Sequence, residues 1–137
     1  MRIFKGWHYD KGWYYYDTNG NKLYGWQQIG KYWYYFDAKN ADYPGLMAVN
    51  GKKEINGYTY FFTGGGEMQT GWIRYPEGWY YAHSGRNQQI GWLQLGKNWY
   101  YLDGKNTEHP GLMLANCELT LGKYQYAFKS DGVMRTG

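Results

Sequence analysis

The chain has 137 residues, a formal net charge of +4 and an aromatic content of 23%. Disordered chains combine few aromatic residues with a high net charge, so this composition predicts a folded protein whose buried surface is built from rings. The sequence contains no apolar run of about 18 residues, which excludes a spanning helix.

In chain order, two short aromatic motifs recur. Gly-Trp at residues 6–7, 25–26, 71–72 and 91–92 is followed six or seven residues later by Trp-Tyr-Tyr, at residues 13–15, 33–35, 79–81 and 99–101. Two further units, at 58–62 and 124–128, keep a ring-rich segment without either Trp. The recurrence predicts about six units, with approximate bounds 6–24, 25–48, 49–70, 71–90, 91–113 and 114–137.

A larger duplication overlies these units. Residues 44–47 reappear at 110–113, and the Met-x-Thr-Gly of 68–71 reappears at 134–137, both at an offset of 66. We therefore expect two copies of a three-unit block. No linker separates the copies, so residues 1–137 are predicted to form a single repeat domain.

Each unit is predicted to be a β-hairpin. Short aromatic runs favour strands, and clusters of Gly, Asn and Asp between them favour turns. The second and fifth units carry longer loops, at 37–43 and 103–109, each followed by a Pro. No apolar period of 3.6 residues is visible, so helix should be nearly absent. The expected fold is all-β, a solenoid of about six stacked hairpins.

The spacing of the rings suggests binding sites between hairpins. Successive strand residues face opposite ways, so Trp33 and Tyr34 should serve different interfaces, and Trp26 can meet Trp33 within its own hairpin. With Tyr60 of the next hairpin, three rings would surround a small space that suits a quaternary ammonium. The alternative is that these rings are plain core. Against it, both Trp positions are lost together in the third and sixth units.

The pattern Gly-Trp, Trp-Tyr-Tyr and Gly-x-Met-x-Thr-Gly resembles the choline-binding, cell-wall-binding repeats of Gram-positive surface proteins and phage lysins. The resemblance covers nearly the whole chain and implies a left-handed β-solenoid with choline boxed between consecutive hairpins. Two Trp of one repeat and the first Tyr of the next form each box. Carried over, the boxes are Trp7, Trp13 and Tyr34; Trp26, Trp33 and Tyr60; Trp72, Trp79 and Tyr100; and Trp92, Trp99 and Tyr126. Candidate apolar floors are Leu23, Met47, Ile90 and Met113.

The resemblance implies a non-catalytic module that binds choline or phosphocholine of teichoic and lipoteichoic acids and anchors an attached protein at the cell wall. It also implies a choline-promoted homodimer. Four boxes are expected, and the junction between the third and fourth units, walled by Tyr80, should be dry. The runner-up is a glycan-binding repeat module, since flat rings also stack on sugars. Those relatives usually carry Lys or a similar residue where Trp13, Trp33, Trp79 and Trp99 stand.

Other functions find little support. The carboxylates sit mostly beside turn residues, and the three His occupy unrelated repeat positions, so neither a catalytic constellation nor a metal site is expected. Cys117 is alone, which excludes an internal disulfide. The basic residues are dispersed, so no nucleic-acid partner is expected. The expected location is extracellular, although residues 1–5 do not resemble a secretory signal, which would lie on a missing part or not be needed.

Overall fold

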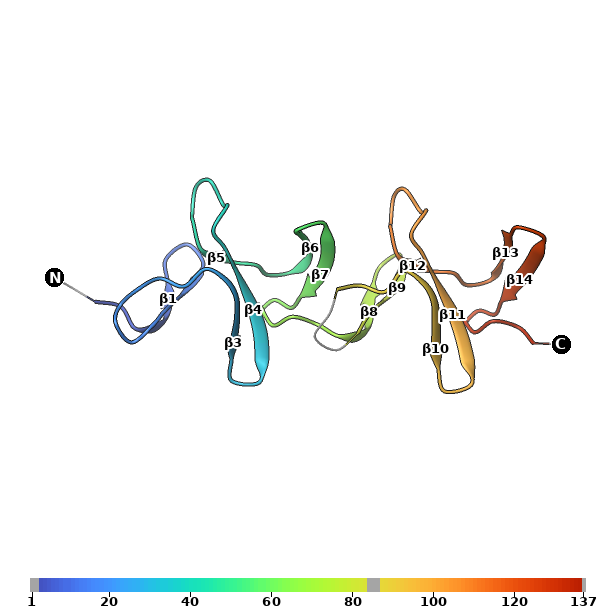
Figure 1. Cartoon of the computed structure of the whole chain (residues 1–137), viewed down its shortest axis with the longest axis horizontal. Coiled ribbons are helices and arrows are strands. Elements are labelled where there is room, and N and C mark those ends of the chain that lie inside the picture. The colour runs from blue at the N-terminus through green and yellow to red at the C-terminus, as the bar shows by residue number, and fades with distance from the viewer. Residues whose placement is uncertain (1–2, 84–86, 137) are drawn as a thin grey trace. The chain divides into compact units, whose positions relative to one another are not determined.

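The computed structural model describes residues 3–83 and 87–136, and within these ranges the chain is all β, as predicted. In the described residues, fourteen strands form six sheets, each built on one hairpin (Figure 1). The strands are β1 (Gly6–Tyr9), β2 (Trp13–Tyr16), β3 (Gly25–Ile29), β4 (Tyr32–Asp37), β5 (Leu46–Met47), β6 (Gly51–Ile55), β7 (Tyr58–Phe62), β8 (Gly71–Tyr75), β9 (Gly78–Ala82), β10 (Gly91–Leu95), β11 (Asn98–Asp103), β12 (Leu112–Met113), β13 (Cys117–Leu121) and β14 (Tyr124–Phe128).

Hairpins 1 to 6 are the antiparallel pairs β1–β2, β3–β4, β6–β7, β8–β9, β10–β11 and β13–β14. Tight turns close them. Between β6 and β7, Asn56 and Gly57 both have positive φ (53° and 85°), the backbone that a two-residue hairpin turn requires. The Asn-Gly pair therefore sets the register of this hairpin.

After each hairpin the chain folds back onto the second strand. In hairpins 2 and 5 the returning segment forms a short strand, β5 or β12. In the other four it forms a single bridge, as between Phe62 and Met68. The predicted longer loops precede β5 and β12. Asn40 Oδ1 in the first loop accepts hydrogen bonds from the backbone N–H groups of Asp42 and Tyr43. In the second loop, Asn106 Oδ1 accepts the equivalent bonds from Glu108 and His109.

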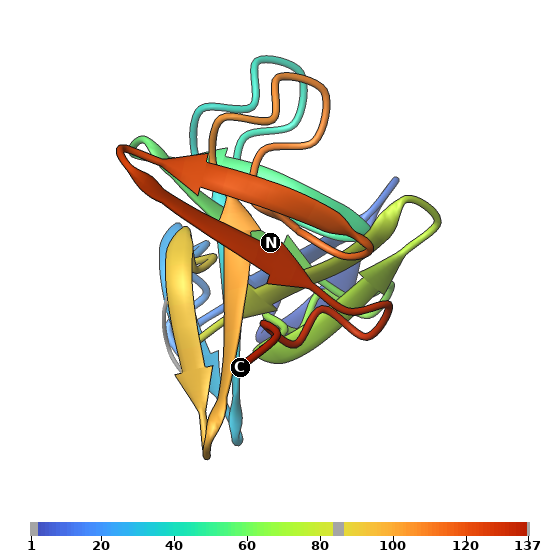
Figure 2. The same cartoon turned by 90° about the vertical axis from the view of Figure 1, so that its right-hand side faces the viewer.

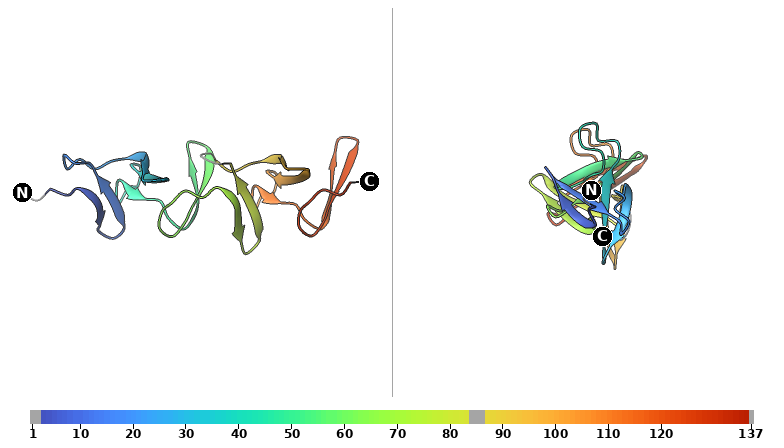
Figure 3. Two further views of the ribbon diagram at one scale, coloured as in Figure 1. Left: turned by 90° about the horizontal axis from the view of Figure 1, so that it is seen from below. Right: turned by 90° about the vertical axis from the view of Figure 1, so that its left-hand side faces the viewer.

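The chain divides into two compact units, residues 1–69 and 70–137, which coincide with the two copies of the three-hairpin block. Within each unit, the three hairpins follow one another in chain order with changing orientation (Figure 3). The long loop projects away from the middle hairpin of its own unit (Figure 2). A single domain over all 137 residues stays a prediction.

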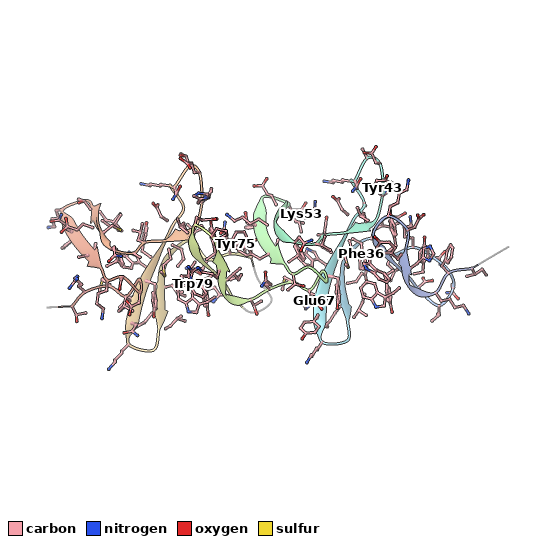
Figure 4. All side chains as sticks on the ribbon, turned by 180° about the vertical axis from the view of Figure 1, so that it is seen from behind. Phe36, Tyr43, Lys53, Glu67, Tyr75 and Trp79 are labelled. Carbon is pink, nitrogen blue, oxygen red and sulfur yellow. The ribbon has the colours of Figure 1, made fainter. Side chains whose placement is uncertain are left out.

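Among the described residues, the buried core comes mainly from second strands, with Met47 of a returning segment and Ile55, Ile73 and Leu93 of first strands, and it contains no tryptophan. In unit 1, Tyr34, Phe36 and Met47 form a buried cluster, against which Tyr15 and Ile29 pack (Figure 4 labels Phe36). In unit 2 the fully buried Leu102 stands at the position of Phe36. Burying such apolar side chains stabilises each unit by about 1.5–3 kcal/mol per residue.

Candidate functional site: aromatic boxes between hairpins

Strand register places the two tryptophans of a hairpin on one face. Trp7 of β1 pairs with Tyr15 of β2, and Trp13 lies two residues before Tyr15. Side chains two residues apart on a strand share a face, so Trp7 and Trp13 are diagonal neighbours. The same register recurs in hairpins 2, 4 and 5. The predicted encounter of the two rings across the hairpin is therefore a diagonal one.

The first box lies between hairpins 1 and 2. The Trp7 ring meets the Trp13 ring edge-on, with centroids 6.1 Å apart, and the Tyr34 ring at 5.0 Å. A hollow of about 390 Å³ is lined by Trp7, Trp13, Tyr34, Met47 and Gly65. Trp7 and Trp13 are 40% and 41% exposed, so these rings are not plain core. The structure brings together the three rings predicted for this site and one of the predicted apolar floors.

The third box repeats this geometry in unit 2. Trp72 and Trp79 stand 6.2 Å apart at an interplanar angle of 81°, and Tyr100 lies 5.0 Å from Trp72. Its hollow of about 290 Å³ is lined by these rings together with Met113, Ser130 and Asp131. Figure 4 shows Trp79 on the second strand of hairpin 4. Perpendicular rings present their faces toward a shared space, the arrangement that a cation prefers.

The fourth box has the same rings with a different floor. Trp92 and Trp99 stand 6.1 Å apart, and Tyr126 of hairpin 6 lies 4.9 Å from Trp92. The hollow measures about 230 Å³, and Met134 completes its lining. Hairpin 6 lacks tryptophan, and its Tyr126 is the third ring that lines this hollow.

The second box is the counterpart of the fourth in unit 1. Trp26 meets Tyr60 of hairpin 3 with centroids 4.7 Å apart. Trp33 lies on the same face of hairpin 2, since it precedes by two residues the Tyr35 that pairs with Trp26. Trp33 is 38% exposed and its counterpart Trp99 is 37% exposed. The backbone N–H of Met68 donates to the Trp33 carbonyl, as that of Met134 does to Trp99, both at 2.8 Å.

Met47 and Met113 each line the first box of their own unit, a placement that the repeat pattern did not predict. Met47 and Met113 belong to the returning strands of hairpins 2 and 5, and they line the first and third boxes. Gly66 and Gly132 give them room, because each has φ near +90° and an added Cβ would overlap the methionine end. Ile90 lies beside Gly104 and Gly111, and neither it nor Leu23 lines the three hollows given above, so their role as floors stays a prediction.

In each unit, the turn that follows the second strand of the third hairpin also lines the first box of that unit. Gly65 follows β7 and reaches the box of Trp7 and Trp13, while Ser130 and Asp131 follow β14 and reach the box of Trp72 and Trp79. Sequence reasoning gave the Trp-less hairpins one contribution each, a tyrosine for the preceding box. Each Trp-less hairpin makes two contributions, because the turn that follows it also lines the box formed by the first two hairpins of its unit.

Local charge differs among the boxes. In the third box, the Arg74 guanidinium carbon lies 5.3 Å from the Trp79 centroid, and the carboxyl-bearing Asp131 forms part of the lining. In the first box, burial is the main cause that raises the pKa of Tyr34, and the nearby Glu67 raises it further. Tyr34 therefore remains a neutral phenol through the physiological range, and its ring is available as a cation–π partner.

Metal chemistry finds no support in residues 3–83 and 87–136, where no group of three or more His, Cys, Asp or Glu could hold an ion. Over the same residues, no helix is long and apolar enough to cross a bilayer. What these boxes can do chemically is to enclose a weakly hydrated cation with aromatic faces and a thioether.

Comparison with known proteins identifies the repeats. The choline-binding family model described as "Putative cell wall binding repeat" matches residues 25–39 and 90–105, which contain the tryptophans of the second and fourth boxes. No curated protein sequence matches the chain significantly.

Solved structures match over nearly the whole chain. Choline-binding protein F from Streptococcus pneumoniae is 34% identical over 96% of this chain, with a TM-score of 0.83. CbpJ from Streptococcus pneumoniae TIGR4 is 32% identical over 96%, also with a TM-score of 0.83. The cell wall endolysin from phage Cp-1, solved complexed with choline, is 29% identical over 100%, with a TM-score of 0.61.

The chain spans 42% of the length of each of the two pneumococcal proteins and 38% of that of the endolysin. Motif and fold agree with these relatives. The chain is a repeat module of the choline-binding, cell-wall-binding family.

Proposed function

We propose that the module binds choline in four aromatic boxes, two in each unit, and thereby attaches a protein to choline-bearing teichoic and lipoteichoic acids outside the cell. The observation that carries the proposal is the arrangement of two partly exposed tryptophans and a tyrosine of the next hairpin around an open hollow in the first, third and fourth boxes, which the register of hairpin 2 repeats in the second. A trimethylammonium group has no hydrogen to donate, so aromatic faces are its natural partners.

Each box should bind weakly. A desolvated cation–π contact contributes on the order of 1–2 kcal/mol, and association costs oppose the sum, so a dissociation constant of about a millimolar is expected. Several boxes engaging one polymer that bears many cholines would raise the avidity by about 10²–10⁴. Modest single-site affinity with strong polymer retention suits an anchoring role.

The charge of the module is compatible with such a partner. Its net charge of +4 and sequence pI near 9.0 favour approach to a phosphate-bearing polymer. Because the choline-binding relatives are longer than this chain, the activity of the parent protein is itself a proposal: a catalytic or effector domain outside these 137 residues, delivered to its wall substrate by this module.

The test is retention on an immobilised choline matrix followed by elution with free choline. We expect retention, and a variant with both Trp33 and Trp99 replaced by Ala should elute at a lower choline concentration. The matched control replaces Tyr58 and Tyr124, which are 57% and 59% exposed and line none of the described boxes. The control should elute like the unchanged chain.

The alternative is glycan binding, and the same column separates the two. Elution by dextran or an oligosaccharide, with no effect of choline, would contradict the proposal and favour the glycan reading. The retention of Trp at positions 13, 33, 79 and 99 supports choline. Choline-promoted homodimerisation is a further part of the proposal, and sedimentation velocity with and without choline tests it.

A further inference from the structure

A second hollow adjoins the fourth box and has a different character. It measures about 370 Å³, and its lining includes three basic side chains, those of Lys97, Lys129 and Arg135. Trp99 and Met134 line both this hollow and the fourth box. The two spaces are therefore neighbours that share a wall, one aromatic and the other cationic.

The three basic side chains are available to a ligand. All three residues are exposed. Over the part of the chain that the structure describes, the ion pairs are Lys53 with Asp37 and His109 with Glu77, and none involves this hollow. Among the described residues, no acidic one lines it. Three unneutralised cations around one hollow favour an anion, and guanidinium and ammonium groups are the usual partners of phosphate.

Unit 1 provides an internal contrast. At an offset of 66, the places of Lys129, Val133 and Arg135 are taken by Thr63, Glu67 and Gln69, and only Lys97 keeps its charge, as Lys31. The Thr63 hydroxyl donates to the Glu67 carboxylate, which occupies both groups within the turn. The same backbone position beside the second box is thus without the excess of positive charge.

We propose that the basic hollow lined by Lys97, Lys129 and Arg135 is a phosphate-ester subsite that makes the fourth box selective for phosphocholine over choline. The inference rests on the proposed function, because it takes the choline group to lie in the fourth box. Only two carbons and one oxygen separate nitrogen from phosphorus in phosphocholine. A ligand with its ammonium against Trp99 can therefore direct its phosphate across the shared wall. The second box should show no such preference.

The experiment follows the indole N–H signals of the whole chain by NMR, with Trp33 and Trp99 assigned through Trp→Phe variants. Choline, phosphocholine, and choline mixed with glycerol phosphate are titrated separately. At low ionic strength the Trp99 signal should respond to phosphocholine at a concentration about fivefold lower than to choline, and the ratio should shrink as salt is added. The Trp33 signal should respond to both alike.

The matched variant K129T/R135Q gives unit 2 the residues of unit 1 at exposed positions. It should abolish the phosphocholine preference at Trp99 and leave the response to choline unchanged. If glycerol phosphate with choline reproduces the effect, the phosphate is recognised as a separate group of the polymer, which also supports the subsite. Retention of the preference in the variant, or equal affinity for choline and phosphocholine at Trp99, would overturn the inference alone. No response of any indole to choline would overturn the proposed function instead.

Discussion

The two units share their rings and differ in what surrounds the rings. Each has two pairs of tryptophans in the same register and a third hairpin without tryptophan. Each carries a formal net charge of +2, from eight basic and six acidic residues in unit 1 and seven and five in unit 2. The placement of charge, and not its amount, distinguishes the units. Gly65 of the first box becomes Asp131 in the third, and Glu67, close to Tyr34, becomes Val133 in the basic hollow beside the fourth.

This contrast indicates that rings and turn residues have different roles in the duplicated block. The rings set which chemical group can be bound, and they are kept in both units. Turn residues set the charge at the rim of a box, and they vary. Changes in the turns that follow the third hairpins can therefore tune individual boxes without altering the rings of the boxes or the buried core of each unit.

The largest expected effect comes from removing a ring that both units share. Trp33→Ala and Trp99→Ala should each lower the number of bound cholines from four to three, measured by calorimetry. Because both rings are more than a third exposed, each change should destabilise the chain by about 1–2 kcal/mol, below the 3–5 kcal/mol typical of a buried ring. Loss of more than one site from either change would show that the boxes are not independent.

The next effect concerns the glycine that makes room for a box methionine. Gly66→Ala places a Cβ at φ +90° and against Met47, so we expect a loss of about 2 kcal/mol in the free energy of unfolding and weaker choline binding in the first box. Gly57→Ala is the control, since Gly57 has a similar φ of +85° and an added Cβ there meets nothing within 4 Å. Urea unfolding compares them, and equal losses would contradict the steric argument.

Much of this could be predicted from the sequence, because strand alternation and turn residues are local properties. Gly-Trp and Trp-Tyr-Tyr predict the hairpins, and the structure brings Tyr60 beside Trp26 and Tyr126 beside Trp92. That these rings form choline boxes stays a prediction. The boxes that each methionine lines were harder to predict. Met47 lines the box that precedes its own hairpin, which depends on how the returning strand packs and not on its place in the repeat.

The contribution of Asp131 to the third box could not be predicted from the repeat pattern. Its turn lies more than 50 residues from Trp72 and Trp79, and the rotation between successive hairpins brings it to their box. No periodicity of side chains within a strand encodes that rotation. The sequence nevertheless held a signal for the neighbouring methionine, since Met134 belongs to the recurring Gly-x-Met-x-Thr-Gly pattern.

A smaller effect tests the charge at the rim. Asp131→Gly gives the third box the residue of the first, and it should weaken choline binding there by about threefold, the worth of one exposed charge interaction. Asp131→Asn keeps the size and should do the same. Titrations at low and high salt are the measurement. An effect of Asp131→Gly that is absent in Asp131→Asn would mean that the carboxylate charge plays no part.

The smallest expected effect concerns an ion pair that only unit 1 has among the described residues. Lys53 Nζ (Figure 4) lies 3.0 Å from Asp37 Oδ2, whereas Leu119 stands at the position of Lys53 in unit 2. Burial opposes ionisation of Asp37, but the hydrogen bond from Lys53 and the backbone N–H of Lys39 outweigh it and lower its pKa below 3.8. Lys53→Leu should cost about 0.5 kcal/mol at neutral pH.

The pH dependence of that cost has a definite sign. The pKa of Asp37 is depressed in the folded state, so its contribution is complete above pH 3.8 and is lost as the pH falls through the lower folded value. Unfolding of the chain and of Lys53→Leu should therefore differ at pH 6 and converge in strong acid. A difference that persists in strong acid would assign the effect to packing of the lysine stem.

The central claim is that choline occupies the aromatic boxes, two in each unit. A crystal structure of the chain grown or soaked with choline tests it most directly. The account predicts ligand density beside Trp7 and Trp13, beside Trp26 and Trp33, and in the two corresponding boxes of unit 2, with none against the ring of Tyr80. Choline density at Tyr80, or none beside Trp26 and Trp33, would contradict it.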